Sequence, residues 1–204
     1  MLTQLFTLSL LLQLHAIGVD KTIMALNEKQ VDKQEVRAAA EEINTYKQYD
    51  IPLSKDLQQY IHKQAEKYNL SYELMLAIAH TESTFRTDIV SYDGSSVGLF
   101  QINTSNTIDW LGDNVGLSKP NAKNPYHSAQ MATWYINYLK EKYLNEGYKK
   151  EAVIKRVLIG YRYGVGKSAK YVRQNGLHHK YIDKVLAYKT KLESGVLDGL
   201  STLY

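Results

Sequence analysis

The chain has 204 residues, of which 44% are hydrophobic and 23% are charged, with a formal net charge of +4 and no cysteine. This length suits one compact domain with a modest appendage, and the composition supports a buried core and excludes a globally disordered chain. The lack of cysteine excludes disulfides and thiolate catalysis.

The positive charge is concentrated in one half of the chain, because residues 140–204 hold 14 Lys and Arg against 6 Asp and Glu. An anionic partner is one interpretation of this bias, and a set of solvated helix faces is the other. No nucleic-acid-binding motif accompanies the basic residues. We therefore expect no nucleic-acid partner.

Residues 1–19 carry no Lys, Arg, Asp or Glu and form a candidate secretory signal, with Ala16 or Gly18 as the small residue before cleavage. Nothing basic precedes the apolar run, so a surface-docked helix is the alternative. We expect a secreted or cell-envelope protein that contacts the membrane or envelope through this segment, or a protein carried in a phage virion. Residues 20–52 are charged and Ala-rich, which predicts a helical stalk or linker that ends at Pro52.

The main domain is expected over residues 53–194, before a C-terminal tail at 195–204. Ser54 and Ser71 stand where N-caps precede helical apolar spacing. The second of these helices is apolar on nearly every side, which predicts that it is buried in the core.

Residues 85–103 alternate apolar and turn-forming residues around Asp93-Gly94, which predicts a small β-hairpin or sheet. A short helix and a loop are expected over 104–124. Helical periodicity then returns at 129–143, 152–163 and 181–192, with Gly195 as a stop signal. The sum is a mainly α fold with a small β lobe.

Glu82 is the principal candidate for chemistry. It stands at the end of the apolar second helix, where burial and the negative end of the helix dipole both favour the neutral carboxyl. A carboxyl that keeps its proton near neutral pH can donate it to a glycosidic oxygen. An isolated Glu near a helix end is more commonly a solvated surface residue, so the surrounding sequence has to decide.

Glu82 belongs to the first of three motifs that follow one another along the chain. Glu82-Ser83 is followed by Ser91, then by Gly98-Leu-Phe-Gln101-Ile, and much later by Tyr161-Arg-Tyr-Gly164. The chain resembles the soluble lytic transglycosylase (SLT-type) family, relatives of goose-type lysozyme, over residues 54 to about 192. The resemblance implies a lysozyme-like α+β fold with the cleft between these motifs, and peptidoglycan glycan strands as the partner.

The resemblance also implies a role for each matching residue. Glu82 occupies the position of the catalytic acid and base, and Ser91 that of a serine that contacts the reacting sugar. Phe100 and Gln101 occupy cleft-lining positions, and Asn103, which follows them in the same segment, is expected to bind the substrate with them. Tyr161 matches a tyrosine whose hydroxyl orients the catalytic Glu. Tyr163 is expected either in the cleft or in the core, as is Phe100.

Two residues depart from the family pattern, which has Met at position 100 and Asn at position 162. Phe100 preserves an apolar, bulky side chain. Arg162 introduces a charge, which either binds a substrate carboxylate or points into solvent.

The resemblance implies non-hydrolytic cleavage of the MurNAc–GlcNAc bond, with closure of a 1,6-anhydro ring and no cofactor. The alternatives are a hydrolytic muramidase, for which Asp88 and Asp93 are the candidate second carboxylates, and a weakly active wall-binding part of a phage tail or secretion apparatus. No metal site is expected, because the side chains of the adjacent His178 and His179 diverge on a helix or loop. The Gly-Lys-Ser at 166–168 lacks the spacing of a phosphate loop.

Overall fold

The computed structural model describes residues 46–195. The candidate signal at 1–19, residues 20–45 of the expected stalk and residues 196–204 of the expected tail lie outside this range. The chain divides into two units, Met1–Lys47 and Gln48–Tyr204, and the second contains every described helix and strand. Within 46–195, no helix has the length and apolar character needed to cross a membrane.

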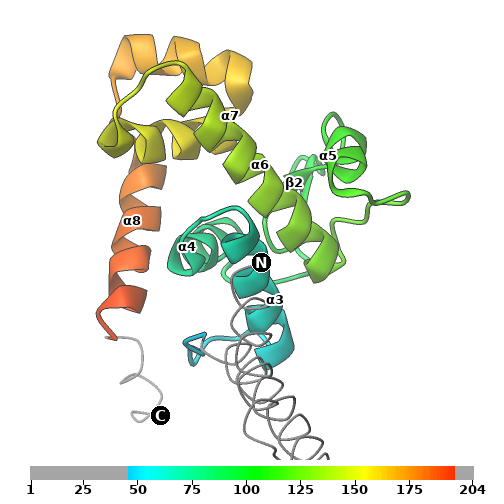
Figure 1. Ribbon diagram of the computed structural model, residues 1–204. Helices are drawn as coiled ribbons and strands as arrows, with labels where there is room; N and C mark the ends of the chain where they lie inside the picture. The colour runs from blue at the N-terminus through cyan, green and yellow to red at the C-terminus, as the bar shows by residue number, and fades with distance from the viewer. Residues whose placement is uncertain (1–45, 196–204) are drawn as a thin grey trace, which may run out of the picture. The chain divides into compact units, whose positions relative to one another are not determined.

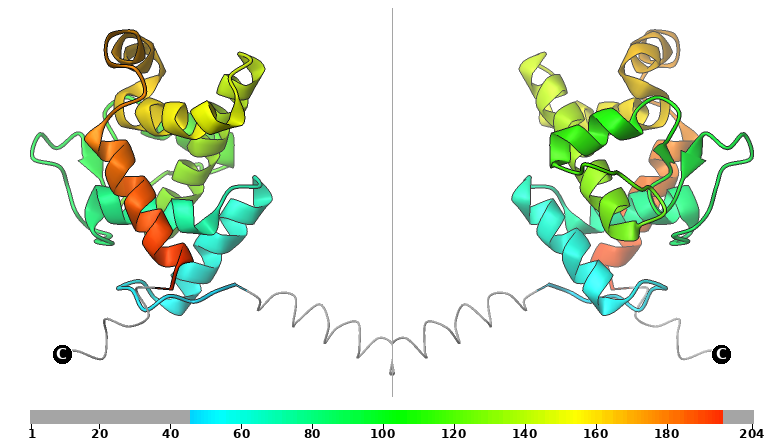
Figure 2. Two further views of the ribbon diagram at one scale, coloured as in Figure 1. Left: turned by 90° about the vertical axis from the view of Figure 1, so that its left-hand side faces the viewer. Right: turned by 90° about the vertical axis from the view of Figure 1, so that its right-hand side faces the viewer.

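The described part of the chain is mainly helical, with one small antiparallel sheet, as the sequence predicts (Figure 1). Helix α4 packs against α3 and α8, while α6 packs against α3, α5 and α7. Figure 2 shows the same arrangement from two further sides. The elements are α3 (Lys55–Lys67), α4 (Tyr72–Ser83), β1 (Ser96–Val97), β2 (Ile102–Asn103), α5 (Ile108–Val115), α6 (Pro125–Asn145), α7 (Lys150–Asn175) and α8 (Lys180–Glu193).

The helices begin where the sequence offers capping residues. The Ser54 hydroxyl accepts from the backbone N–H of Leu57 at 3.2 Å, and the Ser71 hydroxyl accepts from that of Leu74 at 3.1 Å. Each bond satisfies a backbone donor that the first turn of a helix leaves unpaired. Both predicted caps are confirmed, and so is Gly195, whose positive φ of 73° follows the end of α8.

Helix α4 forms the centre of the core, as its apolar sequence predicts. Its run from Met75 to Ala79 has no exposed surface. Because neighbouring helices cover it on several sides, the position of its C-terminal end, where Glu82 lies, is set by packing rather than by a surface loop.

The predicted β segment is present but minimal. Strand β1 pairs with β2 through Ser96 opposite Asn103 and Val97 opposite Ile102, and Val90 forms a further bridge to Val97. The Asp93-Gly94 turn connects that bridge to β1, with Gly94 at φ 71°. These short pairings hold the base of a loop that projects from the helices (Figure 2).

Helix α7 continues past the predicted end at residue 163 to Asn175, but it is kinked. Gly164 has φ 74° and ψ 158°, which breaks the helical path between Tyr163 and Val165. A positive φ of this size favours glycine, because other residues meet steric strain there. The kink therefore places two helix ends at one point, next to the cleft described below.

The packed unit starts before the expected boundary at residue 53. Tyr49 is 2% exposed and its ring lies 5.9 Å from that of Tyr72. The buried Gln58 side chain accepts from the Tyr49 N–H at 3.0 Å and donates to its carbonyl at 3.1 Å. The end of the segment expected as a stalk thus belongs to the packed unit.

Candidate active site

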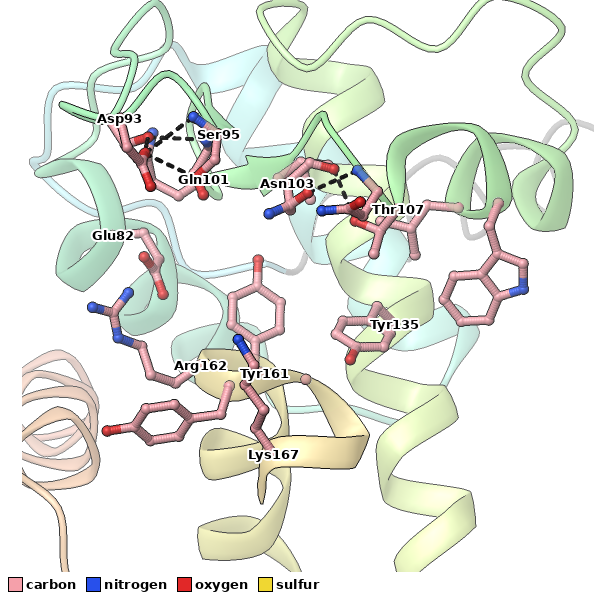
Figure 3. A pocket seen from close by; sticks show the side chains of 18 residues that line it. Glu82, Asp93, Ser95, Gln101, Asn103, Thr107, Tyr135, Tyr161, Arg162 and Lys167 are labelled. Atoms are coloured by element: carbon pink, nitrogen blue, oxygen red, sulfur yellow. Dashed lines mark hydrogen bonds between the residues drawn. The ribbon is translucent and has the colours of Figure 1, made fainter. Parts of the chain in front are cut away.

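A cleft of about 580 Å³ lies between the C-terminal end of α4, the β segment, α5, α6 and the kink of α7 (Figure 3). Seven of the eight residues that the sequence singled out line it: Glu82, Ser91, Gln101, Asn103, Tyr161, Arg162 and Tyr163. Asp93, Ser95, Ser96, Ile102, Asn106, Thr107, Trp110, Leu111, Tyr135, Gly164 and Lys167 complete the lining. Residues distant in sequence are thus brought to one polar cavity.

Glu82 lies in the last turn of α4, where its carboxyl faces the cleft. The backbone turns sharply just after it, since Thr84 and Phe85 both have positive φ, at 54° and 64°. Burial of the carboxyl raises the pKa of Glu82 above its ordinary value of 4.5. The predicted upward shift of the Glu82 pKa is therefore confirmed. The shift favours the protonated carboxyl that a general acid needs.

Two neighbours moderate this rise. The Tyr181 hydroxyl on α8 and the Arg162 guanidinium both lower the pKa of Glu82, although burial remains the larger effect. Figure 3 shows the Arg162 guanidinium directed at the Glu82 carboxyl. The Tyr181 hydroxyl is buried and has no hydrogen-bond partner among the described residues, yet it is close enough to Glu82 to affect the pKa of that carboxyl. One cation and one tyrosine hydroxyl thus lower the pKa of Glu82 against the effect of burial.

Tyr161 does not make the bond to Glu82 that the family resemblance implies. Its hydroxyl donates to the backbone carbonyl of Phe100 at 2.7 Å, and a tyrosine has only one proton to donate. Burial and the nearby Glu82 carboxylate raise the pKa of Tyr161 well above 10. Tyr161 therefore stays neutral and ties α7 to the β segment, while Tyr181 provides the hydroxyl that lowers the pKa of Glu82.

Phe100 itself is placed in the core and not in the cleft, because its side chain has no exposed surface. Its backbone N–H donates to the buried Ser128 hydroxyl at 3.2 Å, which holds the segment against α6. Gly98 serves a similar structural purpose: at φ 81°, an added Cβ would lie 1.9 Å from the Ala122 carbonyl oxygen. The close approach that requires glycine at this position is thus to the backbone at Ala122.

The loop that carries Ser91 forms a hydrogen-bonded wall of the cleft. Asp93 accepts from the Ser91 hydroxyl at 2.6 Å, and from the backbone N–H and hydroxyl of Ser95 at 3.1 and 2.8 Å. These donors lower the pKa of Asp93 to about 2. Asp93 is therefore an ionised carboxylate that shares the cleft with Glu82, whereas Asp88 does not line the cleft.

Two amide side chains present polar groups to the cleft. Gln101, at φ 47°, donates from Nε2 to the carbonyls of Ile89 at 3.3 Å and Gly98 at 3.1 Å. Its amide oxygen remains as an acceptor for a ligand donor. Asn103 accepts from the Asn106 N–H at 3.0 Å, which leaves its amide nitrogen as a donor. Such a pair suits a ligand that carries hydroxyl and acetamido groups.

Tyr163 lines the cleft and contacts α8. Its hydroxyl lies 2.9 Å from Nε2 of His179, whose Nδ1 accepts from the Tyr181 N–H at 2.9 Å. His179 is therefore the N-cap of α8. Among residues 46–195 no cluster of three His, Cys, Asp or Glu side chains is suited to a metal ion.

Sequence reasoning missed several cleft residues, notably Trp110, Tyr135, Lys167 and the nearby Tyr181. Tyr181 and Tyr135 fall in helices where an aromatic residue predicts ordinary core packing. Lys167 follows the kink at Gly164, which is visible only in the structure. Trp110 alone carried a signal, as a large aromatic residue in a short segment rich in polar residues.

Comparison with known proteins shows the family to which the chain belongs. Residues 59–183 match the family model described as transglycosylase SLT domain, which is more than half of the chain. The chain therefore belongs to the transglycosylase SLT domain family. No curated protein sequence matches it significantly.

Among solved structures, the chain is similar to an inactive mutant of the lytic transglycosylase Slt from Pseudomonas aeruginosa, with a TM-score of 0.57 and 15% sequence identity. The match covers 72% of this chain and 25% of that one. The chain thus corresponds to about a quarter of that larger protein. At this identity the likeness shows the fold, which is helix-rich and lysozyme-like with a small antiparallel sheet.

Proposed function

We propose that the protein is an enzyme that cleaves the β-1,4 bond between N-acetylmuramic acid and N-acetylglucosamine in peptidoglycan, with formation of 1,6-anhydromuramic acid. The observation that carries this proposal is Glu82, a carboxyl with a raised pKa that faces a polar cleft in a chain of the transglycosylase SLT domain family. No metal or cofactor takes part in the proposed reaction.

In the first step Glu82 acts as a general acid. Its carboxyl proton passes to the oxygen that links the two sugars, the bond from that oxygen to C1 of the muramyl residue breaks, and the other sugar leaves with a hydroxyl. Positive charge develops at C1. The oxygen of the substrate's own acetamido group stabilises this charge, so the step needs no second carboxylate.

In the second step the same residue acts as a base. The Glu82 carboxylate takes the proton from the C6 hydroxyl of the muramyl residue, and the C6 oxygen bonds to C1, which closes the anhydro ring and restores the acid. Arg162 stabilises the carboxylate between the two steps, because its guanidinium lowers the pKa of Glu82. No water enters the products.

Hydrolysis is a second candidate, and Asp93 is the observation that favours it. This carboxylate is ionised and lines the cleft together with Glu82. A second carboxylate can act as base for a water molecule or stabilise positive charge at C1. However, Asp93 is exposed and its oxygen Oδ1 already accepts three hydrogen bonds, which makes it a weak base. We therefore rank hydrolysis second.

Mass spectrometry of the fragments released from purified peptidoglycan tests the proposal. Fragments that end in anhydromuramic acid are about 18 Da lighter than the hydrolytic ones, because no water is added. Their predominance is the expected result, and reducing ends in the major fragments would establish hydrolysis. If neither kind is released while the Glu82→Gln variant behaves identically, the protein is a wall-binding component.

The proposed substrate lies outside the cytoplasmic membrane. The proposed function therefore includes delivery of the protein to the envelope, by export through residues 1–19 or as part of a phage virion. Detection of the protein in extracellular, envelope or virion fractions tests this part separately.

A further inference from the structure

Four large aromatic side chains gather where α5 packs against α6: Trp110, Trp134, Tyr135 and Tyr138. We refer to them as the aromatic platform. Trp134, Tyr135 and Tyr138 lie on adjoining positions of α6, and Trp110 reaches them from α5. The chain contains two tryptophans, Trp110 and Trp134, and both belong to the platform.

The rings of the platform adopt two orientations. On α6, the ring of Tyr138 lies 5.6 Å from Trp134 and 6.1 Å from Tyr135, each at an interplanar angle of 13°. Trp110 meets all three rings edge-on, at centroid distances between 5.0 and 6.0 Å and angles between 76° and 86°. These are favourable geometries for aromatic pairs. The platform is therefore ordered by its own contacts before any ligand binds.

The platform is continuous with the catalytic cleft. Trp110 and Tyr135 line the cleft together with Glu82, whereas Trp134 and Tyr138 lie beyond its lining. The Tyr135 ring is 5.9 Å from that of Tyr161, a residue close enough to Glu82 for the two groups to affect one another's charge. Figure 3 shows Tyr135 on the side of the cleft away from Glu82. An aromatic path thus leads outward from the acid.

Packing of α5 onto α6 does not account for the whole platform, because large parts of it face solvent. Trp110 is 42% exposed and Tyr138 is 37% exposed. Contiguous apolar groups at a surface, rimmed by polar residues, are typical of binding sites. Asn106 and Thr107 provide polar groups on the neighbouring stretch of the cleft.

We propose that the aromatic platform is an additional binding site for the glycan strand, several sugars away from the bond that is cut. This inference rests on the proposed function. The flat apolar faces of pyranose rings match aromatic rings, and the adjacent polar groups suit their hydroxyls. The platform would select long strands over short fragments, because only a long strand reaches Tyr138 and Glu82 together.

Binding can be measured without catalysis, because the platform contains its own fluorescent probes. We would titrate peptide-free glycan strands into the Glu82→Gln protein and follow tryptophan emission. A saturable change with long strands that weakens about three- to tenfold in affinity on adding Tyr138→Ala is the expected result. An unchanged affinity in the Tyr138→Ala protein overturns the proposal.

The second measurement uses the active protein, which retains Glu82, and compares its kinetics on substrates of different length. Tyr138→Ala should raise the KM for long strands more than the KM for a peptidoglycan tetrasaccharide. Tyr126→Ala is the matched control, since Tyr126 is on the same helix, is 39% exposed and packs instead against Tyr60. Equal effects of Tyr138→Ala on both substrates would refute glycan binding at the platform and would leave the proposed cleavage reaction unaffected. Absence of any cleavage would refute the proposed function. The fluorescence titration would then test by itself whether the platform binds glycan strands.

Discussion

The hydroxyl of Tyr161 and the backbone carbonyl of Phe100 form a 2.7 Å hydrogen bond that joins the kinked helix α7 to the segment before Gln101. This bond connects two walls of the cleft that are 61 residues apart in sequence. On one side Tyr161 lies three residues before the kink at Gly164, and on the other Phe100 directly precedes Gln101, which has a left-handed conformation at φ 47°. Both segments line the cleft together with Glu82.

Replacement of Tyr161 by Phe should therefore act through the architecture of the cleft. The variant leaves the Phe100 carbonyl without its partner, which costs about 1–3 kcal/mol for a buried group. We expect a lower midpoint in urea unfolding and a reduced kcat/KM. Tyr163→Phe, which removes a hydroxyl from the bond to the partly exposed His179, is the control and should destabilise less. Equal stability of Tyr161→Phe and wild type would contradict this account.

Replacement of Glu82 by Gln should separate activity from stability. Loss of the transferable proton should reduce turnover by about 10²–10⁴-fold. Because the pKa of Glu82 is raised in the folded protein, the stability linked to this group is present at low pH and is lost as pH rises from 4.5 through the folded pKa. Unfolding at several pH values should show this loss in wild type and not in the variant. A variant that cleaves peptidoglycan at the wild-type rate would disprove the assignment of Glu82.

Arg162 should set the alkaline limit of activity. Its charge lowers the pKa of Glu82, so Arg162→Gln should raise that pKa and keep the acid protonated to higher pH. The descending limb of the kcat/KM profile should therefore move to higher pH. Lys167→Gln is a matched control, because Lys167 lines the cleft but is not among the groups that shift the pKa of Glu82. Identical shifts in both variants would indicate a general charge effect.

The N-terminal limit of the folded unit can be tested by shortening the chain. A protein of residues 48–204 keeps Tyr49 and its bonds to Gln58, so it should unfold cooperatively and remain active on isolated peptidoglycan. A protein of residues 53–204 leaves the buried Gln58 amide without two backbone partners and removes the Tyr49 ring from the core. Thermal unfolding should show a clear loss of stability. Equal melting temperatures for the two would show that Tyr49 is dispensable.

Much of this structure was predictable from local sequence, because its signals are local. Serine caps, an apolar helix and a turn dipeptide each depend on a few neighbouring residues, and Ser54, Ser71 and Gly195 stand where predicted. The same holds for the cleft, where seven of eight candidate residues meet. Helix α7 beyond Gly164 was missed, since its polar sequence offers little periodicity and, of its residues after the kink, only Ser168 is buried.

The roles within the cleft were less predictable, because they depend on side-chain directions. Phe100 points into the core because the chain beside it adopts positive φ at Gly98 and Gln101, and no sequence pattern reveals that path. Tyr161 was expected to act on Glu82, but its hydroxyl bonds to Phe100. Tyr181 acts on Glu82 instead, since α8 packs against α4 and brings Tyr181 close to the carboxyl. The aromatic platform likewise forms only when α5 meets α6.

Asp93 distinguishes the two candidate reactions. Asp93→Asn preserves the shape of the side chain and its acceptor for Ser91 and Ser95 but removes the negative charge. In the proposed reaction the C6 hydroxyl is held against C1, and oriented intramolecular nucleophiles reach effective molarities of roughly 10⁵–10⁸ M, far above that of water at about 55 M. Asp93 is not needed for that step, so anhydro ends should still predominate.

The rate of the Asp93→Asn variant should accordingly fall by less than about tenfold, a loss that fits a substrate contact and not general base catalysis. A hydrolase that depends on Asp93 as its base should behave differently: its reducing-end products should decline by about 10²-fold or more, with any remaining cleavage shifted toward anhydro ends. The ratio of the two product masses, measured before and after the substitution, thus reports whether Asp93 activates water or only helps to shape the loop beside Glu82.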